Sequence, residues 1–299
     1  MIAIDLGSNT IRVLEYDCTT HKELSGYSKV VKTADGLIST NIIDDKAIDR
    51  VIDALKEAQE IIDFSSHQIK AVTTEALRRA NNSDYALDKI KSATGVEFEI
   101  ISGDEEARLT LLAVEFRLDK LNHSSDNFVV IDIGGGSTEV IFKYKDETIS
   151  QSFSIGIVTI AQKYSSLQKI EENLPKDMRD IREFAQKVVS TKGKVGSFVG
   201  TAGTPTTLAS MKLGMVYATY DASQINGTTL KFDELKLYLN ELLSLEAKQR
   251  EIVVGVGRYD LILAGILIYA ELFHILDFDE CIVVDDGLRE GVAIDWCRY

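Results

Sequence analysis

Two stretches of the chain, residues 2–14 and 129–142, share one pattern of hydrophobic and polar positions. In each, an apolar run ends in an aspartate, small residues follow, and a second apolar run begins. β-Branched runs on both sides of a glycine-containing turn predict a β-hairpin. Superposing the two stretches places Asp5 on Asp132. We therefore expect two hairpins of one design, each with an aspartate where its first strand ends.

Both turns carry groups that suit an anion. Glycine can adopt positive φ and lets backbone N–H groups approach a phosphate, and neighbouring hydroxyl groups add further donors. Asp132 is placed to hold a Mg²⁺ ion that screens phosphate charge. An ordinary glycine-rich hairpin turn is the alternative for the second copy taken alone. The candidate phosphate-binding residues are Gly7, Ser8 and Asn9 in the first turn and Gly134, Gly135, Gly136, Ser137 and Thr138 in the second.

Helices and strands alternate along the rest of the chain. Apolar positions at the 3.6-residue period predict a helix that is capped by Asp44 or Asp45 and runs to about Ile62. The other expected helices cover about residues 84–93, 102–117, 157–165, 176–191, 206–213, 232–243 and 258–275, and the other expected strands cover residues 23–32, 69–73, 96–101, 148–154 and 281–284. A terminal helix follows Gly291. Such alternation is typical of α/β proteins.

A third turn that could receive an anion follows the short apolar strand near residue 198. Its sequence, residues 200–204, contains two glycines and two threonines and leads into Pro205. Proline favours the first turn of a helix, and a helix N-terminus offers backbone N–H groups to an anion. Gly203 and Thr204 are the candidate ligands. An ordinary loop between a strand and a helix accounts for the same sequence equally well.

One acidic residue stands out at the start of the helix expected over residues 102–117. Ser102 and Glu105 have the spacing of a capping box, so Glu105 is expected to satisfy a backbone donor. That explanation does not cover Glu106. A solvated acid in the first helical turn, favoured by the helix dipole, is the simplest alternative for it.

Length and composition indicate a globular protein of two domains. The chain has 299 residues, of which 45% are hydrophobic and 27% charged. The segment Lys120–Asn127 is polar and is the best candidate for the domain boundary. We expect domains at residues 1–120 and 121–290, and the terminal helix, residues 291–299, could return to the first.

Charge and cysteine usage narrow the class of protein further. A net charge of −14 argues against nonspecific binding to DNA or RNA, which requires a basic face. No apolar run approaches the ~18 residues that span a membrane, and no signal peptide is evident, so we expect no membrane partner. Cys18, Cys281 and Cys297 are an odd, scattered set, which indicates a reducing compartment and no structural zinc. These features predict a cytoplasmic protein.

Six motifs, taken in order, resemble those of the exopolyphosphatase/guanosine pentaphosphate phosphatase (Ppx/GppA) family in its short two-domain form. They cover residues 5–9, 74–78, 101–108, 132–139, 200–204 and 287–291. The resemblance implies an α/β protein with two RNase H-like domains of the actin/Hsp70/sugar-kinase superfold and a cleft between them. The sequence departs from the family pattern at Val284, where serine is common. It also lacks the C-terminal helical extension of longer members.

The resemblance also implies a reaction and its residues. The family consists of Mg²⁺-dependent phosphatases that release orthophosphate from the end of inorganic polyphosphate or from the guanosine nucleotide pppGpp, and Mn²⁺ is an alternative ion. By motif position, Glu106 would be the general base that activates water, and Arg78 would hold the terminal phosphate. Asp5, Asp132 and Glu139 would be the carboxylates on the metal side.

Two other classes of function remain open at this stage. An ATP-dependent kinase of the same superfold would use the same hairpins for ATP and a separate aspartate for an acceptor. A non-catalytic, nucleotide-gated sensor or assembly protein would share the fold alone. The oligomeric state is also open, and a homodimer is one possibility.

Overall fold

The computed structural model describes residues 1–298, except the side chain of Ile38, and the chain divides into two compact units. Unit 1 comprises Met1–Ala113 and the C-terminal residues from Leu288 onward, and unit 2 comprises Val114–Gly287. The division falls inside helix α5 (Gly103–Lys120) and not in the polar segment that follows it. One continuous helix therefore contributes residues to both units. Tyr299, within the expected terminal helix, lies outside the described residues.

Unit 1 is built on a five-stranded sheet in the order β3-β2-β1-β4-β5. Strands β1, β2 and β3 are antiparallel neighbours, whereas β4 and β5 run parallel to β1. Every residue of β1 is buried, as expected for a central strand that is covered on both faces. The strands are β1 (Ile2–Leu6), β2 (Thr10–Asp17), β3 (Lys22–Val30), β4 (Ile69–Thr73) and β5 (Phe98–Ile100).

Unit 2 repeats this plan with one additional strand. Its order is β10-β11-β9-β6-β7-β8, so that β8-β7-β6-β9-β11 corresponds to the sheet of unit 1, and β10 is added antiparallel at the edge. The expected duplication of an α/β half is thus present. The strands are β6 (Phe128–Ile133), β7 (Thr138–Tyr144), β8 (Glu147–Phe153), β9 (Ser197–Thr201), β10 (Thr229–Lys231) and β11 (Glu280–Val283).

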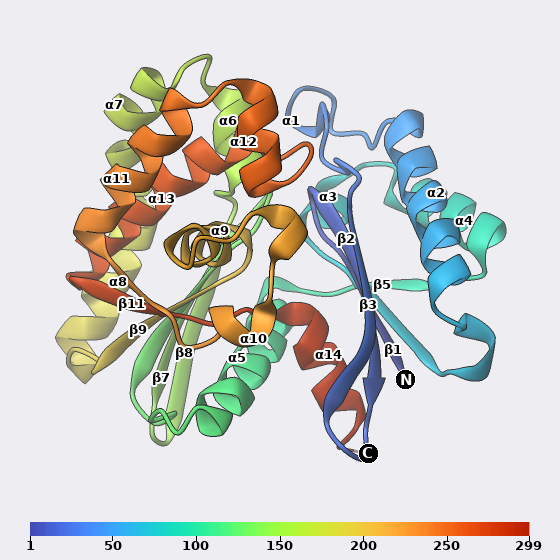
Figure 1. Ribbon diagram of the computed structural model, residues 1–299, viewed down its shortest axis with the longest axis horizontal. Coiled ribbons are helices and arrows are strands. Elements are labelled where there is room, and N and C mark those ends of the chain that lie inside the picture. The colour runs from blue at the N-terminus through green and yellow to red at the C-terminus, as the bar shows by residue number, and fades with distance from the viewer. Residues whose placement is uncertain (299) are drawn as a thin grey trace. The chain divides into compact units, whose positions relative to one another are not determined.

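Helices flank the sheets (Figure 1). Asp44 caps α2, accepting a hydrogen bond from the backbone N–H of Lys46 at 2.8 Å, as expected from sequence. The helices of unit 1 besides α5 are α1 (Leu37–Thr40), α2 (Asp45–Ile61), α3 (Glu75–Arg79), α4 (Ser83–Thr94) and α14 (Leu288–Trp296), with a 3₁₀ turn at Phe64–Ser66. The helices of unit 2 are α6 (Ile157–Lys163), α7 (Leu167–Asp177), α8 (Arg179–Lys192), α9 (Gly203–Lys212), α10 (Ala222–Ile225), α11 (Phe232–Ser244), α12 (Ala247–Val254) and α13 (Leu261–Leu276), with a 3₁₀ turn at Tyr217–Thr219.

The core of unit 2 centres on α13, which is buried along most of its length. Tyr269 and Phe273 of this helix pack edge-to-face on Phe198 of β9, with ring centroids 5.9 and 4.9 Å apart. Such aromatic contacts add to the stabilisation from burial. Within residues 1–298, no helix is both long and apolar enough to cross a bilayer.

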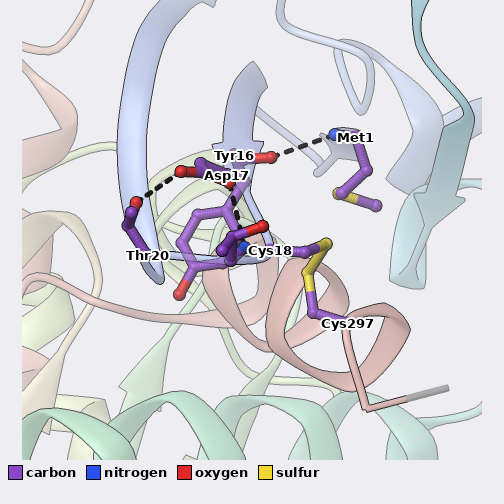
Figure 2. Close-up of a disulfide and its surroundings, with 7 residues drawn as sticks. Met1, Tyr16, Asp17, Cys18, Thr20 and Cys297 are labelled. Atoms are coloured by element: carbon purple, nitrogen blue, oxygen red, sulfur yellow. Dashed lines mark hydrogen bonds between the residues drawn. A yellow bond between two sulfur atoms is a disulfide. The ribbon is translucent and has the colours of Figure 1, made fainter.

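A disulfide closes unit 1. Cys18, in the turn between β2 and β3, is bonded to Cys297, which directly follows α14 (Figure 2). The two cysteines are 279 residues apart in sequence, so spacing could not reveal the pair. Because two of the three cysteines are paired, cysteine usage no longer supports the prediction of a reducing compartment. Cys281 is a free, buried thiol.

Helix α14 packs closely against α5 within unit 1. Gly291 lies so near the backbone of Leu109 that a Cβ atom there would overlap it. Arg108 donates two hydrogen bonds to the carboxylate of Asp295, at 2.9 and 3.1 Å. The terminal helix therefore supports the first turns of α5, which begins at Gly103.

Candidate functional site

The turns of the two hairpins close in the same way. In the first, the backbone N–H of Gly7 donates to the carbonyl of Thr10 at 3.0 Å, and in the second, that of Gly134 donates to Ser137 at 2.9 Å. Both turns lie where the first strand of the hairpin ends. The repeated sequence pattern therefore produces a repeated local structure.

The glycines of the second turn do not adopt left-handed backbone, and the turn packs against the start of α6. None of the three has a positive φ, which corrects the expectation from sequence. Instead, the carbonyls of Gly134 and Gly135 accept hydrogen bonds from the N–H groups of Ile157 and Val158, at 3.0 and 2.8 Å. A Cβ atom on Gly156 would overlap the backbone of Gly135. The turn is thus held against the first residues of α6.

The carboxylates of the second hairpin lie opposite each other. Asp132 on β6 pairs in register with Glu139 on β7. The side chain of Glu139 is only 1% exposed and accepts a hydrogen bond from the hydroxyl of Ser152 at 2.7 Å. In the first hairpin the corresponding partner of Asp5 is Arg12. The two hairpins therefore differ in charge at this position, and only the second pairs two carboxylates.

In unit 1 the expected catalytic residues come together. Arg78 Nη1 donates to Glu106 Oε2 at 2.9 Å and to the carbonyl of Ile101 at 2.7 Å. Arg78 Nη2 lies 3.3 Å from Glu75 Oε2. Glu106 is 8% exposed, so it is not the solvated first-turn acid of the alternative interpretation. The less buried Arg79 reaches Glu75 only at 4.0 Å.

Glu105 makes a different contact from the one expected. The hydroxyl of Ser102 does accept a hydrogen bond from the backbone N–H of Glu105 at 3.1 Å, which is one half of a capping box. The carboxylate of Glu105, however, accepts two hydrogen bonds from Arg108, at 2.7 and 2.8 Å. These contacts, with those to Asp295, raise the pKa of the Arg108 guanidinium. Adjacent glutamates on one helix thus face different partners.

The third loop contains a strained backbone position. Ala202, immediately before α9, has φ 68° and ψ −168°, a region that non-glycine residues rarely adopt. Thr204 turns its hydroxyl into the interior against Gly265, where it is buried without a hydrogen-bond partner among residues 1–298. Gly203 has open space at its Cα. This loop therefore offers an anion the backbone at the start of α9 and not the Thr204 hydroxyl.

In each unit the candidate residues gather at the edge where the parallel strands end. Asp5 lies near the end of β1, Arg78 follows β4, and Glu106 follows β5. In unit 2, Asp132 lies near the end of β6 in register with Thr201 of β9. Ligands of open α/β sheets bind outside the carboxyl ends of the strands. The placement in both units agrees with that rule.

Two ionic contacts at these edges were not anticipated from sequence. The first joins Glu75 to Arg78, and its only sequence signal is their i,i+3 spacing in a short helix. The second joins Arg117 to Asp286, with hydrogen bonds at 2.6 and 2.9 Å. The Thr201 hydroxyl also donates to the backbone carbonyl of Asp286 at 2.8 Å. This second contact ties α5 to the segment after β11, within unit 2.

Comparison with known proteins gives a consistent result. The profile of the Ppx/GppA phosphatase family matches residues 20–299. The chain is 29% identical over 308 residues to a bifunctional 3-dehydroquinate synthase/phosphatase from Fusobacterium nucleatum, an alignment that covers 98% of this chain and 46% of that protein. It is 27% identical over 318 residues to exopolyphosphatase 2 of Mycobacterium tuberculosis, covering 98% and 97% of the two chains.

A solved structure shows the same fold. The crystal structure of the Aquifex aeolicus member of the Ppx/GppA family is 29% identical, with a TM-score of 0.73 and coverage of 99% of this chain and 96% of that one. The chain spans about half the length of the Fusobacterium protein and nearly all of the other two. This likeness and the repeated strand order confirm the expected fold class, an α/β protein of two RNase H-like units.

Proposed function

Because the chain belongs to the Ppx/GppA phosphatase family, we propose that it hydrolyses the terminal phosphoanhydride of inorganic polyphosphate or of pppGpp and releases orthophosphate. The observation that carries this proposal is the buried contact between Arg78 and Glu106, at 2.9 Å. A guanidinium is suited to a terminal phosphate, and a carboxylate beside it is suited to a water that attacks that phosphate. The similarity to exopolyphosphatase 2, which aligns over almost its whole length, supports polyphosphate as the substrate.

The chemistry assigned to these residues is a hydrolysis by direct attack of water. Glu106 accepts a proton from the water as its oxygen bonds to the terminal phosphorus. The bond from that phosphorus to the bridging oxygen breaks, and the shortened chain leaves with the electron pair. Arg78 binds the oxygens of the terminal phosphoryl group and offsets the charge that they carry.

The second hairpin suits a divalent cation. Magnesium is commonly held by one or two carboxylates together with substrate phosphates, so it does not require a complete protein cage. Residues 1–298 contain no cluster of three or more His, Cys, Asp or Glu side chains arranged for a metal. We propose that Asp132 and Glu139 of unit 2 hold Mg²⁺, or alternatively Mn²⁺, which would supply charge neutralisation to the phosphate chain. Asp5 of unit 1 is a candidate ligand by its motif position alone.

The turns provide the remaining contacts in this proposal. Backbone N–H groups and hydroxyls of the two hairpin turns, and the backbone at Gly203 and Thr204, would bind phosphate oxygens along the chain. The net charge of −14 means that these local donors must act against the overall field of the protein. The cytoplasmic location expected from the sequence is part of the same proposal.

The test is phosphate release from polyphosphates of several lengths, pppGpp and ATP, measured side by side with and without Mg²⁺. Release of orthophosphate from polyphosphate or pppGpp in the absence of any acceptor is the expected result. Turnover of ATP that depends on an added acceptor would instead identify a kinase. Concentration-dependent pelleting without any turnover would favour an assembly protein.

A further inference from the structure

Glu75 is a second buried carboxylate beside Arg78. It is the first residue of α3 and is 8% exposed, as buried as Glu106. Its Oε2 atom lies 3.3 Å from Arg78 Nη2, and its Oε1 atom lies 4.0 Å from Arg79 Nε. A buried carboxylate is costly unless it is paired, so the contact with Arg78 is part of what retains Glu75 in this position.

The guanidinium of Arg78 is therefore shared between two carboxylates. Its Nη1 donates to Glu106 and to the carbonyl of Ile101, while its Nη2 faces Glu75. A cation between two anions is attracted to both, so each carboxylate weakens the hold of the other. The strength of the contact between Arg78 and Glu106 is thereby set in part by Glu75.

We propose that Glu75 is a positioning residue that anchors Arg78 while Glu106 releases it. This inference rests on the proposed function. A terminal phosphate that binds Arg78 competes with Glu106 for the same guanidinium. With one side of Arg78 held by Glu75, Nη1 transfers to the phosphate without the side chain leaving its place. Glu106 then accepts the proton of water.

A purely structural role would have different consequences. An acid in the first turn of a helix is favoured by the helix dipole, and Glu75 occupies that position in α3. If that were its whole role, replacing it would alter stability and leave the kinetic constants of the folded protein unchanged. The two roles are therefore separable by kinetics.

The decisive variant is Glu75→Gln, which keeps size and an acceptor but removes the charge. Arg78 then pairs with Glu106 alone, so the release of Glu106 becomes harder. We expect kcat to fall by about tenfold and KM to rise as well, because the terminal phosphate must then compete with a stronger contact between Arg78 and Glu106. Glu75→Asp keeps the charge and should recover most of the lost kcat.

A double-mutant cycle identifies the residue through which Glu75 acts. Combining Glu75→Gln with Arg78→Lys should cost little more than Arg78→Lys alone, because both changes disrupt one unit. Combining it with Arg79→Gln should multiply the separate effects, because Arg79 is the more distant partner. Additive effects with Arg78, or coupling with Arg79 instead, would overturn the proposal.

A readout independent of turnover separates this proposal from the proposed function. Side-chain ¹⁵N NMR, with Arg78 assigned by its loss in Arg78→Lys, reports how freely the guanidinium rotates. We expect slow rotation in the wild type and faster rotation in Glu75→Gln. Unchanged rotation and unchanged kcat would refute the positioning role. Absence of phosphate release by the wild type would refute the proposed function, and the NMR comparison would still decide the role of Glu75.

Discussion

Arg78 Nη1 and Glu106 Oε2 lie 2.9 Å apart although 28 positions separate the two residues in sequence. The reason is topological. Arg78 follows β4 and Glu106 follows β5, and these strands are parallel neighbours in one sheet. Helices that start after adjacent parallel strands begin at the same edge. Arg78 and Glu106, each of which has an ordinary explanation when taken alone, thus form one buried ion pair.

The first prediction concerns Glu106. Glu106→Gln keeps the size of the side chain but removes the basic site, so turnover should fall by roughly 10²–10⁴-fold while phosphate binding stays near normal. Glu105→Gln is the matched control, because Glu105 faces Arg108 on a more exposed part of the same helix. Rates and binding should be measured for both variants. Full activity in Glu106→Gln, or an equal loss in Glu105→Gln, would contradict the assignment.

The second prediction compares neighbouring arginines. A guanidinium presents two parallel N–H groups to a phosphate, which the ammonium of lysine cannot reproduce. Arg78→Lys should therefore raise KM and lower kcat, whereas Arg79→Lys should change both constants little. Steady-state kinetics on polyphosphate provides the comparison. Equivalent behaviour of the two variants would show that Arg78 has no special part in binding.

The third prediction concerns the metal. Carboxylates at Asp132 and Glu139 offer hard oxygen ligands but an incomplete shell, so the ion should be removable. Hydrolysis should vanish in EDTA and return when Mg²⁺ is added in excess. Asp132→Asn should raise the Mg²⁺ concentration that gives half-maximal rate. Undiminished turnover by thoroughly chelated protein would refute a metal requirement.

The fourth prediction concerns the disulfide. Cys18–Cys297 closes a loop that contains most of the chain, and such cross-links typically contribute about 2–4 kcal/mol by restricting the unfolded state. Reduction should therefore lower the unfolding midpoint of the wild type. The double variant Cys18→Ser/Cys297→Ser should have the lower unfolding midpoint already without reductant, and reductant should not change it. A wild-type midpoint that is insensitive to reductant, with three titratable thiols on unfolding, would mean that the bond does not form.

The fifth prediction concerns acid stability. Hydrogen bonds from Arg108 hold the pKa of Asp295 below its ordinary value of 3.8, against the opposing effect of burial. A depressed pKa stabilises the folded state above the ordinary value, and that stabilisation is lost as the pH falls through the lower, folded-state pKa. Urea unfolding of the wild type and Asp295→Asn should therefore differ near neutrality and converge as the pH falls below the ordinary value of 3.8. A difference that stays constant with pH would assign the effect to packing alone.

Local patterns in the sequence were sufficient for the elements that hold the site. The two hairpins, the Asp44 cap and the strand at residues 69–73 lie where they were expected. Each depends on neighbours along the chain: alternating burial, a capping side chain, or glycine in a short turn. For the same reason, the repeated aspartate turn was recognisable before any contact was known.

Other features depended on packing between distant segments, and only the tertiary structure decided them. The sequence could not reveal that Glu75 shares Arg78 with Glu106, that Cys18 meets Cys297, or that the division into units falls inside α5. It also suggested positive φ for Gly134–Gly136, none of which adopts it, and it did not indicate that the turn packs against Gly156 at the start of α6. Backbone conformation and ion pairing at such places are set by the elements packed against them. The sequence of one segment does not show which distant segments pack against it.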